Sequence, residues 1–304
     1  MTWDRVAGKL GKDNLALLAE KRVGVVGLGS GGSFVALSLA MSGVGHFVLI
    51  DSDVLEAGNV VRHAADLRDV GKPKVTAVAE LIYQRAPNAV VETRIGRIEA
   101  NLDALDHLDL LIVGVDGEGP KYIINQACLT RDLTAVYAGV YERGEGGDVC
   151  IIQPYLGPCY ACWAAELREG LVDPRADVEL DYGMIGADGT LEAEPGLWLD
   201  VVRVAAAQAD IALSYLLRAT DARKPLPGNT IILANNVLEI AEGHHLLPFS
   251  AEWVQIERDP HCLVCGDAVR ADRLQEKQPE LSLDDLMHEA GISLETPEEE
   301  EQSS

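Results

Sequence analysis

A glycine-rich turn between a strand and a helix is the feature that most constrains how this chain folds. Residues 23–26 form a short apolar, largely β-branched run, and Gly27, Gly29, Gly31 and Gly32 follow it at once. This order is typical of a nucleotide-binding βα unit, in which Gly27 permits the tight turn, Gly29 lets a phosphate approach the backbone and Gly32 lets the helix pack against the strand. Free N–H groups at the start of the helix favour an anionic ligand.

Further along, expected strands and helices alternate. A second strand, residues 46–50, ends in Asp51, and the almost uninterrupted apolar run 108–115 ends beside Asp116. The other strands are expected at 89–93, 134–140, 147–153 and 230–239, and helices at 74–85, 120–131 and 197–217. This alternation predicts an α/β fold with a doubly wound, Rossmann-like and mostly parallel sheet. Ligands of such sheets bind outside the carboxyl ends of the strands, where Asp51 and Asp116 fall.

Composition divides the chain into three parts. Residues 1–20 are expected to form a helical N-terminal arm, and residues 21–266 one α/β domain. Within that domain, the acidic, glycine-containing stretch of about residues 166–196 shows no periodicity of a helix or a strand, which predicts a mobile crossover loop. Residues 267–304 are acidic and end in a run of glutamates, so we expect a largely disordered tail.

Charge and hydropathy exclude several classes of partner. The chain of 304 residues carries 25 basic and 49 acidic side chains, a net charge of −24, which repels nucleic acid and anionic lipid. The N-terminus has no long apolar segment, and polar or charged residues interrupt the most apolar later stretch, residues 199–217. We therefore expect a soluble, cytoplasmic protein that binds neither nucleic acid nor membrane.

Four of the six cysteines form two C-x-x-C pairs, Cys159 with Cys162 and Cys262 with Cys265. Each pair has the spacing with which proteins supply two thiolates to a tetrahedral zinc ion. Four thiolates leave no open position for water, so the predicted zinc is structural and staples the two ends of the C-terminal part together. The alternative is four buried cysteines without a metal. Cysteines used as metal ligands favour a reducing compartment.

Polar residues after the second strand distinguish between two kinds of nucleotide-dependent enzyme. The glycine turn and Asp51 alone fit a nicotinamide-dependent dehydrogenase equally well. The segment that follows concentrates carboxylate, amide and basic groups, in Asp51, Asp53, Asn59, Arg62 and Lys74. Hydride transfer has little use for these groups, whereas a reaction at phosphorus does, because cations neutralise the charge that develops on phosphate oxygens. A carboxylate such as Asp116 is then suited to hold magnesium.

These motifs together resemble the ThiF/MoeB-type adenylating enzymes, which are related to ubiquitin-activating enzymes. The resemblance spans residues 5–266 and rests on the glycine turn, the sequences LIDSDVLEAGNVVRH and GKPKV, Asp116, GPCYACW and HCLVCG. It implies ATP-dependent adenylation of the C-terminal carboxylate of a small β-grasp protein, either ubiquitin-like or a sulfur carrier. Pyrophosphate would be released, and the enzyme would be a homodimer.

The resemblance also implies roles for individual residues. Asp51 would bind the ribose of ATP, and Asp116 would bind Mg²⁺. The phosphates would be bound by Asn59, Arg62 and Lys74, and the nucleotide site would be completed by Gly27, Gly29, Gly31, Gly32 and Asp53. Arg5 is expected to match the arginine that the family's N-terminal arm sends into the partner subunit's site.

Three departures from the family pattern refine this expectation. Asp116 is followed by glycine where the family often has asparagine, and His63 follows Arg62 where glutamine is common. The predicted crossover loop contains no cysteine, so a thioester nucleophile is missing from it. We therefore expect an enzyme that stops at the acyl-adenylate and passes it to a separate acceptor or conjugating enzyme.

The sequence leaves three alternatives open. Within the same family, the chain would adenylate a peptide or an amino acid in a biosynthetic pathway. The glycine turn with Asp51 still permits an NAD-dependent oxidoreductase, although a lone G-x-G-x-x-G pattern is weak support for one. A non-catalytic dimeric scaffold is the third.

Overall fold

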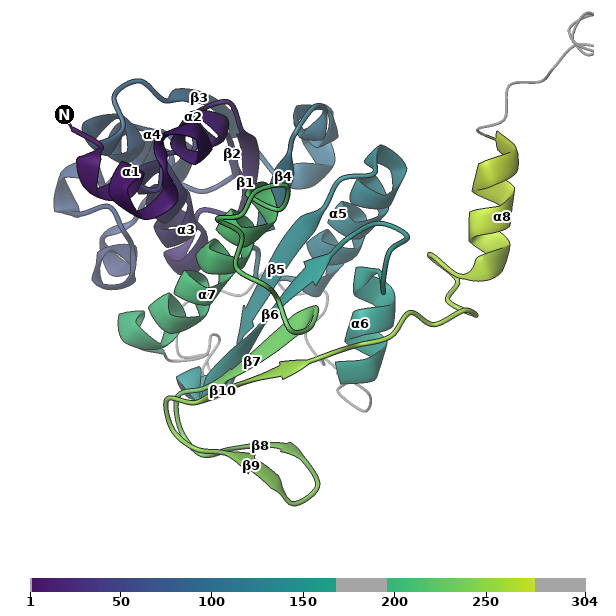
Figure 1. Cartoon of the computed structure of the whole chain (residues 1–304). Helices are drawn as coiled ribbons and strands as arrows, with labels where there is room; N and C mark the ends of the chain where they lie inside the picture. The colour runs from purple at the N-terminus through teal and green to yellow at the C-terminus, as the bar shows by residue number, and fades with distance from the viewer. Residues whose placement is uncertain (1, 168–195, 277–304) are drawn as a thin grey trace, which may run out of the picture. The chain divides into compact units, whose positions relative to one another are not determined.

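Figure 1 shows the chain as a computed structural model, which describes residues 2–167 and 196–276. The chain divides into two compact units, residues 1–259 and 260–304. The first unit contains the sheet with its covering helices, and the described part of the second contains a short turn and helix α8 (Asp267–Glu276). Among the described residues, every helix is too short or too polar to cross a membrane.

The first unit contains ten strands and seven α-helices in its described part. The strands are β1 (Arg22–Val26), β2 (His46–Asp51), β3 (Val90–Ile95), β4 (Leu110–Val113), β5 (Ala135–Val140), β6 (Gly146–Ile152), β7 (Thr230–Ala234), β8 (Leu238–Ala241), β9 (His244–Leu246) and β10 (Ala251–Val254). The helices are α1 (Asp4–Leu10), α2 (Lys12–Ala19), α3 (Ser30–Met41), α4 (Lys74–Arg85), α5 (Glu118–Arg131), α6 (Tyr160–Leu167) and α7 (Trp198–Leu216). Short 3-10 helices are η1 (Ala57–Arg62), η2 (Leu67–Asp69), η3 (Ile98–Ala100), η4 (Leu102–Leu105) and η5 (Glu142–Gly144).

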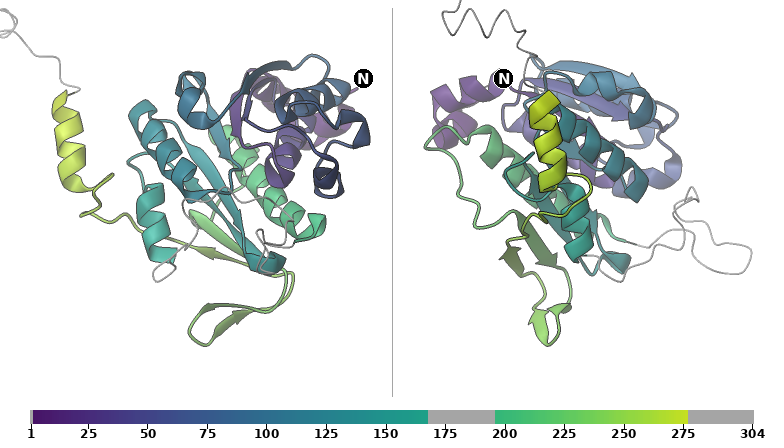
Figure 2. Two further views of the ribbon diagram at one scale, coloured as in Figure 1. Left: turned by 180° about the vertical axis from the view of Figure 1, so that it is seen from behind. Right: turned by 90° about the vertical axis from the view of Figure 1, so that its right-hand side faces the viewer.

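Eight of these strands form one sheet in the order β10-β7-β6-β5-β4-β1-β2-β3. The five strands from β3 to β5 run parallel, and β6, β7 and β10 each pair antiparallel with the strand before them in the sheet. The predicted α/β fold with a mostly parallel, Rossmann-like sheet is confirmed. The remaining strands, β8 and β9, form a hairpin that extends away from the sheet in each view (Figures 1 and 2).

Two hydrophobic clusters cover the two faces of the sheet. Helices α3, α4 and α7 pack in one cluster, and α5 and α6 pack in the other. Successive residues of the buried strands alternate between the clusters: Val25 and Leu49 belong to the first, Val26 and Ile50 to the second. This alternation follows from the period of two residues in a strand, and it explains why the central strands are apolar throughout.

Two predicted elements differ in the structure. The helical segment 1–20 consists of two helices separated at Gly11, whose φ of +88° interrupts the helix, and Leu18 of the second helix is fully buried in the core. The single strand predicted over 230–239 is wrong. Strand β7 ends at Ala234 because Asn235 turns away and hydrogen-bonds through its backbone N–H to Glu145 O (2.8 Å), and β8 begins only at Leu238.

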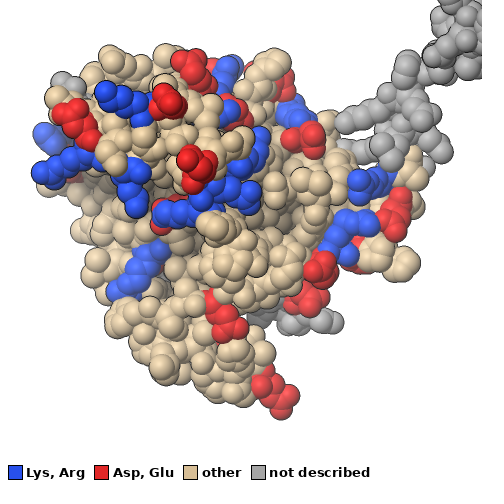
Figure 3. Space-filling model, in the orientation of Figure 1, with Lys and Arg blue, Asp and Glu red and all other residues tan. Residues whose placement is uncertain are grey.

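Acidic side chains are unevenly distributed along the chain. Residues 168–195 and 277–304, which lie outside the described residues and hold most of the predicted crossover loop and tail, carry 17 of the 49 acidic and three of the 25 basic side chains. On the face drawn in Figure 3, Lys and Arg side chains gather over α1 and α2. The described residues are therefore closer to charge balance than the whole chain.

Candidate active site

A cavity of about 710 Å³ opens at the carboxyl ends of the parallel strands. The segments that end β1, β2, β3 and β4 each contribute to its wall, through Gly27, Asp51, Gly96 and Asp116. Its volume lies within the range of roughly 300–1,000 Å³ that is typical of ligand sites. The predicted site residues that line it are Gly27, Gly29, Asp51, Asp53, Asn59, Arg62, Lys74 and Asp116.

The glycine turn brings backbone close to this cavity. Gly27 has a φ of +84°, and a Cβ there would lie 2.7 Å from the carbonyl oxygen of Gly114. A Cβ on Gly32 would collide with the carbonyl oxygen of Gly27, so only glycine lets α3 begin so close to β1. A Cβ on Gly29 would meet nothing within 4 Å, which leaves room for a ligand there. Gly31 and Gly32 lie in the first turn of α3 and do not line the cavity.

Asp51 connects the end of β2 to the glycine turn. Its Oδ2 atom accepts a hydrogen bond from the backbone N–H of Leu28 (2.5 Å), and its Oδ1 atom accepts one from Asp53 N–H (2.8 Å). Burial raises the pKa of Asp51 above its ordinary value, and the two backbone hydrogen bonds and the charge of Lys74 only partly oppose this effect. The carboxylate is therefore positioned by the backbone on both sides.

Lys74 and Asp53 form an ion pair inside the cavity wall. Lys74 Nζ lies 2.6 Å from Asp53 Oδ2, and the Lys74 side chain is only 12% exposed, whereas that of Asp53 is 57% exposed. Burial opposes ionisation of Asp53, but the hydrogen bond and the charge of Lys74 outweigh it, so the pKa of Asp53 lies below its ordinary value. An ammonium group held in this way is available to a phosphate without first being ordered.

The 3-10 helix η1 presents Asn59 and Arg62 to the cavity. Asn59 Oδ1 accepts a hydrogen bond from Glu56 N–H (2.9 Å), and the backbone carbonyl oxygen of Glu56 accepts one from the backbone N–H of Asn59 (3.0 Å). This reciprocal arrangement fixes the start of η1. Because Oδ1 is used in this way, Nδ2 is the part of the Asn59 amide that can donate to a ligand.

Arg97 and Glu99 also line the cavity, and neither was predicted from the sequence. They follow β3, whose actual end at Ile95 lies two residues beyond the predicted one. Gly96 has a φ of +138° and turns the chain there, with its N–H bonded to Asp51 O at 3.0 Å. A Gly-Arg pair at the end of a third parallel strand was the available signal, since all such ends meet at one edge of the sheet.

The cavity contains groups that fit a nucleotide with magnesium. The basic side chains of Arg62, Lys74 and Arg97 suit phosphates, and the carboxylates of Asp53 and Asp116 supply the oxygen ligands that Mg²⁺ prefers. Arg5 lies on α1 and does not line the cavity of its own chain. Its predicted role in a partner subunit stays a prediction, as do the roles of the other site residues.

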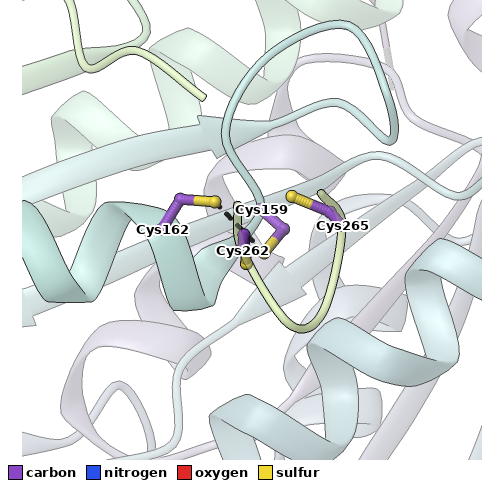
Figure 4. Close-up of side chains that lie close together, drawn as sticks. All are labelled: Cys159, Cys162, Cys262 and Cys265. Carbon is purple, nitrogen blue, oxygen red and sulfur yellow. Dashed lines mark hydrogen bonds between the residues drawn. The ribbon is translucent and has the colours of Figure 1, made fainter. Parts of the chain in front are cut away.

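The cysteine pairs form a second candidate site. Cys159 and Cys162 are buried at the start of α6 with their Sγ atoms 3.8 Å apart, and the 262–265 turn is closed by a hydrogen bond from Gly266 N–H to Cys262 O (2.8 Å). All four Sγ atoms lie within 4.8 Å of one another (Figure 4). Zn–S bonds of about 2.3 Å in a tetrahedron place sulfurs about 3.8 Å apart, so this cluster fits zinc.

Comparison with known families decides the family of the chain. The model of the ThiF family matches residues 4–242, which include every strand of the main sheet except β10 and every residue that lines the cavity. The chain belongs to the ThiF family. The resemblance that the glycine turn, the polar segment and the cysteine pairs predicted is thus confirmed.

Curated relatives of this ThiF-family chain include two activating enzymes and an adenylyltransferase and sulfurtransferase. The SAMP-activating enzyme E1 of Haloferax volcanii is 27% identical over 267 residues, which cover 86% of each chain. The adenylyltransferase and sulfurtransferase UBA4 of Yarrowia lipolytica is 25% identical over 84% of this chain, which spans 58% of the UBA4 chain. Ubiquitin-like modifier-activating enzyme 5 of Drosophila mojavensis is 30% identical over 48% of this chain and 40% of its own length.

Solved structures share the fold of this ThiF-family chain at lower identity. The crystal structure of Escherichia coli MccB with ATP superimposes with a TM-score of 0.62 and 20% identity, covering 83% of this chain and 69% of MccB. A crystal structure of PaaA gives a TM-score of 0.56 and 21% identity over 80% of this chain and 66% of that one. At this identity the likeness establishes the fold alone.

Proposed function

We propose that this chain uses Mg·ATP to adenylate the C-terminal carboxylate of a small β-grasp protein, either ubiquitin-like or a sulfur carrier, and releases pyrophosphate. The observation that carries the proposal is the meeting of three kinds of group around one cavity. Arg62 and Lys74 are cations for phosphates, Asp51 is a half-buried carboxylate beside the glycine turn, and Asp116 is a carboxylate just after β4. A nicotinamide-binding site has no need of the cations Arg62 and Lys74 together with the carboxylate of Asp116.

Each residue is proposed to act as follows. Asp51 binds the ribose hydroxyls, while Asn59, Arg62 and Lys74 bind the phosphates. An oxygen of the incoming carboxylate attacks the α-phosphorus, and the bond from that phosphorus to the bridging oxygen of pyrophosphate breaks. The basic side chains stabilise the negative charge that develops during this transfer. Magnesium held by Asp116 would neutralise phosphate charge further.

The protein whose C-terminus is adenylated is inferred from the relatives. The names of the relatives refer to activation of SAMP, to adenylyl and sulfur transfer, and to a ubiquitin-like modifier. No cysteine occurs from residue 166 to residue 196, and burial raises the pKa of Cys128 to about 12, which leaves a negligible thiolate fraction at neutral pH. Both facts favour release of the acyl-adenylate to a separate acceptor. A homodimer in which Arg5 enters the partner's site completes the proposal.

A peptide is the second candidate substrate. The structural neighbours include MccB in complex with N-formylated MccA, which shares the fold of this chain at a TM-score of 0.63 and 20% identity. The same residues at the cavity would carry out the same transfer to a peptide carboxylate. The two candidate functions differ only in the molecule whose carboxylate is adenylated.

ATP–pyrophosphate exchange distinguishes the candidates. We expect exchange that requires Mg²⁺ and a co-encoded small protein ending in Gly-Gly, and that is lost when the terminal glycine is removed. Arg62→Ala should reduce the exchange rate by about 10²-fold or more. Arg68→Ala is the matched control, because Arg68 is exposed, pairs with Asp66 and does not line the cavity. Exchange with peptides but with no carrier protein would favour the second candidate.

A further inference from the structure

His63 ties the segment after η1 to the glycine turn. Its Nδ1 atom accepts a hydrogen bond from the backbone N–H of Ala65 (2.9 Å), so this nitrogen carries no proton. Nε2 then carries the proton and donates it to the carbonyl oxygen of Leu28 (2.8 Å). The residue is 8% exposed and lines the cavity. These two contacts together select one neutral tautomer of the ring.

The Leu28 carbonyl belongs to the same peptide group as the Gly29 N–H. In a trans peptide the C=O and N–H bonds point in opposite directions, so the hydrogen bond from His63 fixes the direction of the Gly29 N–H. On the other side of the same residue, the backbone N–H of Leu28 donates a hydrogen bond to the Asp51 carboxylate. A contact of 3.4 Å from Ala64 N–H to Ser33 Oγ joins the same segment to the first turn of α3.

We propose that His63 is a positioning residue of the nucleotide site: in its neutral form it holds the Leu28–Gly29 peptide so that the Gly29 N–H faces a phosphate, and its protonation weakens ATP binding. The inference rests on the proposed function, because it assigns the ligand to the same cavity. It goes beyond that function by giving the site a dependence on pH.

Protonation is incompatible with the observed contacts. A proton on Nδ1 would face the N–H of Ala65, and two donors cannot share a hydrogen bond. The contact to Ala65 is therefore lost, and either the ring or the segment 63–65 must move. Burial lowers the pKa of His63 below its ordinary value of 6.5; the Leu28 carbonyl opposes this, the charge of Lys74 on α4 adds to it, and the carboxylate of Asp69 on η2 opposes it. The ring is thus neutral at pH 7 and titrates below pH 6.5.

Replacement of His63 by glutamine keeps the hydrogen-bond donor but removes the group that titrates. In the variant His63→Gln, the side-chain amide can donate to the Leu28 carbonyl but has no proton to gain in this range. His63→Leu removes the donor altogether. His244→Gln is the matched control, because His244 lies on the β8–β9 hairpin, 3.1 Å from Glu252, and does not line the cavity.

The test is the dissociation constant of Mg·ATP, measured by calorimetry on the full chain from pH 5.5 to pH 8. We expect the wild type and His244→Gln to bind more weakly at pH 5.5 than at pH 7.5, by the same factor in both. His63→Gln should lose most of this acid weakening while keeping the affinity at pH 7.5. His63→Leu should bind about tenfold more weakly at pH 7.5, the effect of one lost hydrogen bond.

The outcomes separate the inference from the proposed function. If the wild type binds Mg·ATP and His63→Gln weakens in acid as much as the wild type does, the role of His63 is overturned and the proposed function stands. If the wild type binds no Mg·ATP at any pH, the proposed function is overturned, and the role of His63 with it. Nitrogen NMR provides a check that does not depend on ligand: a proton on Nδ1 of His63 at pH 7 would contradict the inference.

Discussion

The Asp51 carboxylate at the end of β2 accepts a hydrogen bond from the backbone N–H of Leu28 in the glycine turn, at 2.5 Å. The side chain that is proposed to bind ribose therefore also shapes the loop that is proposed to bind phosphates. Charge-assisted hydrogen bonds of this kind are among the stronger ones in proteins. Changes at Asp51 should consequently affect both halves of the nucleotide site.

Asp51→Asn should weaken the binding of Mg·ATP while leaving the free energy of unfolding almost unchanged. Asparagine offers one acceptor oxygen for the two N–H groups that Asp51 now satisfies, so one hydrogen bond is lost, but the cost of a partly buried charge disappears as well. We expect the free energy of unfolding to change by no more than about 1 kcal/mol at pH 7. The affinity for Mg·ATP should fall at least about tenfold, measured by calorimetry.

The pH dependence of the same variant has a defined sign. Because folding raises the pKa of Asp51, the folded state binds the proton more tightly than the unfolded state does. The wild type should therefore gain stability relative to Asp51→Asn as the pH falls through the folded pKa towards 3.8. A difference in unfolding free energy that moves the other way in urea titrations would contradict the burial of this carboxylate.

Lys74→Ala should abolish most of the activity with little loss of stability. The ion pair with Asp53 is partly exposed, so its loss should cost no more than about 1 kcal/mol in urea unfolding. Loss of a cation from the phosphate site should reduce pyrophosphate exchange by about 10²-fold. The neighbouring Lys72 pairs with Asp69 and Glu80 outside the cavity, and Lys72→Ala should leave exchange unchanged. Equal losses in the two variants would argue against the proposed role of Lys74.

Gln208→Leu should destabilise the sheet. The buried Gln208 on α7 donates from Nε2 to Val113 O on β4 (3.1 Å) and to Val136 O on β5 (2.9 Å). Leucine would remove both donors, and the expected cost is about 1–3 kcal/mol in urea unfolding. The exposed Gln126 on α5 provides the control, since Gln126→Leu should change stability by less than about 0.5 kcal/mol. Indistinguishable unfolding of the two variants would show that the bridge does not stabilise the strands.

Removal of zinc should destabilise the chain without involving the cavity residues. We expect one zinc ion per chain in protein purified under reducing conditions, and a lower unfolding temperature after treatment with a chelator. Cys162→Ser should lose the metal, whereas Cys128→Ser should retain it because Cys128 lies on α5, outside the four-cysteine cluster. Full metal content in Cys162→Ser would contradict the assignment of the ligands.

Local sequence patterns were sufficient to predict the site residues that lie at the ends of strands. The carboxyl ends of parallel strands meet at one edge, so Asp51 and Asp116 could be placed together before the structure was known. Arg97 was missed because the third strand runs to Ile95, which brings the next two residues into the same edge. An error of two residues at a strand end was enough to hide a site residue.

Other features depend on contacts between segments that are distant in the sequence. Nothing in the local sequence shows that Gln208 bridges two strands, or that the side chain of Asn235 donates to Gly144 O (2.8 Å) and so helps to end β7. The buried state of His63 likewise results from the approach of the glycine turn. These relationships arise from tertiary packing, which periodicity and motif spacing do not describe.

The most direct test of the central claim is the intact mass of the carrier protein after incubation with this chain and Mg·ATP. We expect a co-encoded small protein ending in Gly-Gly to gain the mass of one adenylate at its C-terminal glycine, with release of pyrophosphate and no carrier thioester on any cysteine of this chain. A carrier whose mass stays unchanged while NAD or NADP binds to the cavity would contradict it.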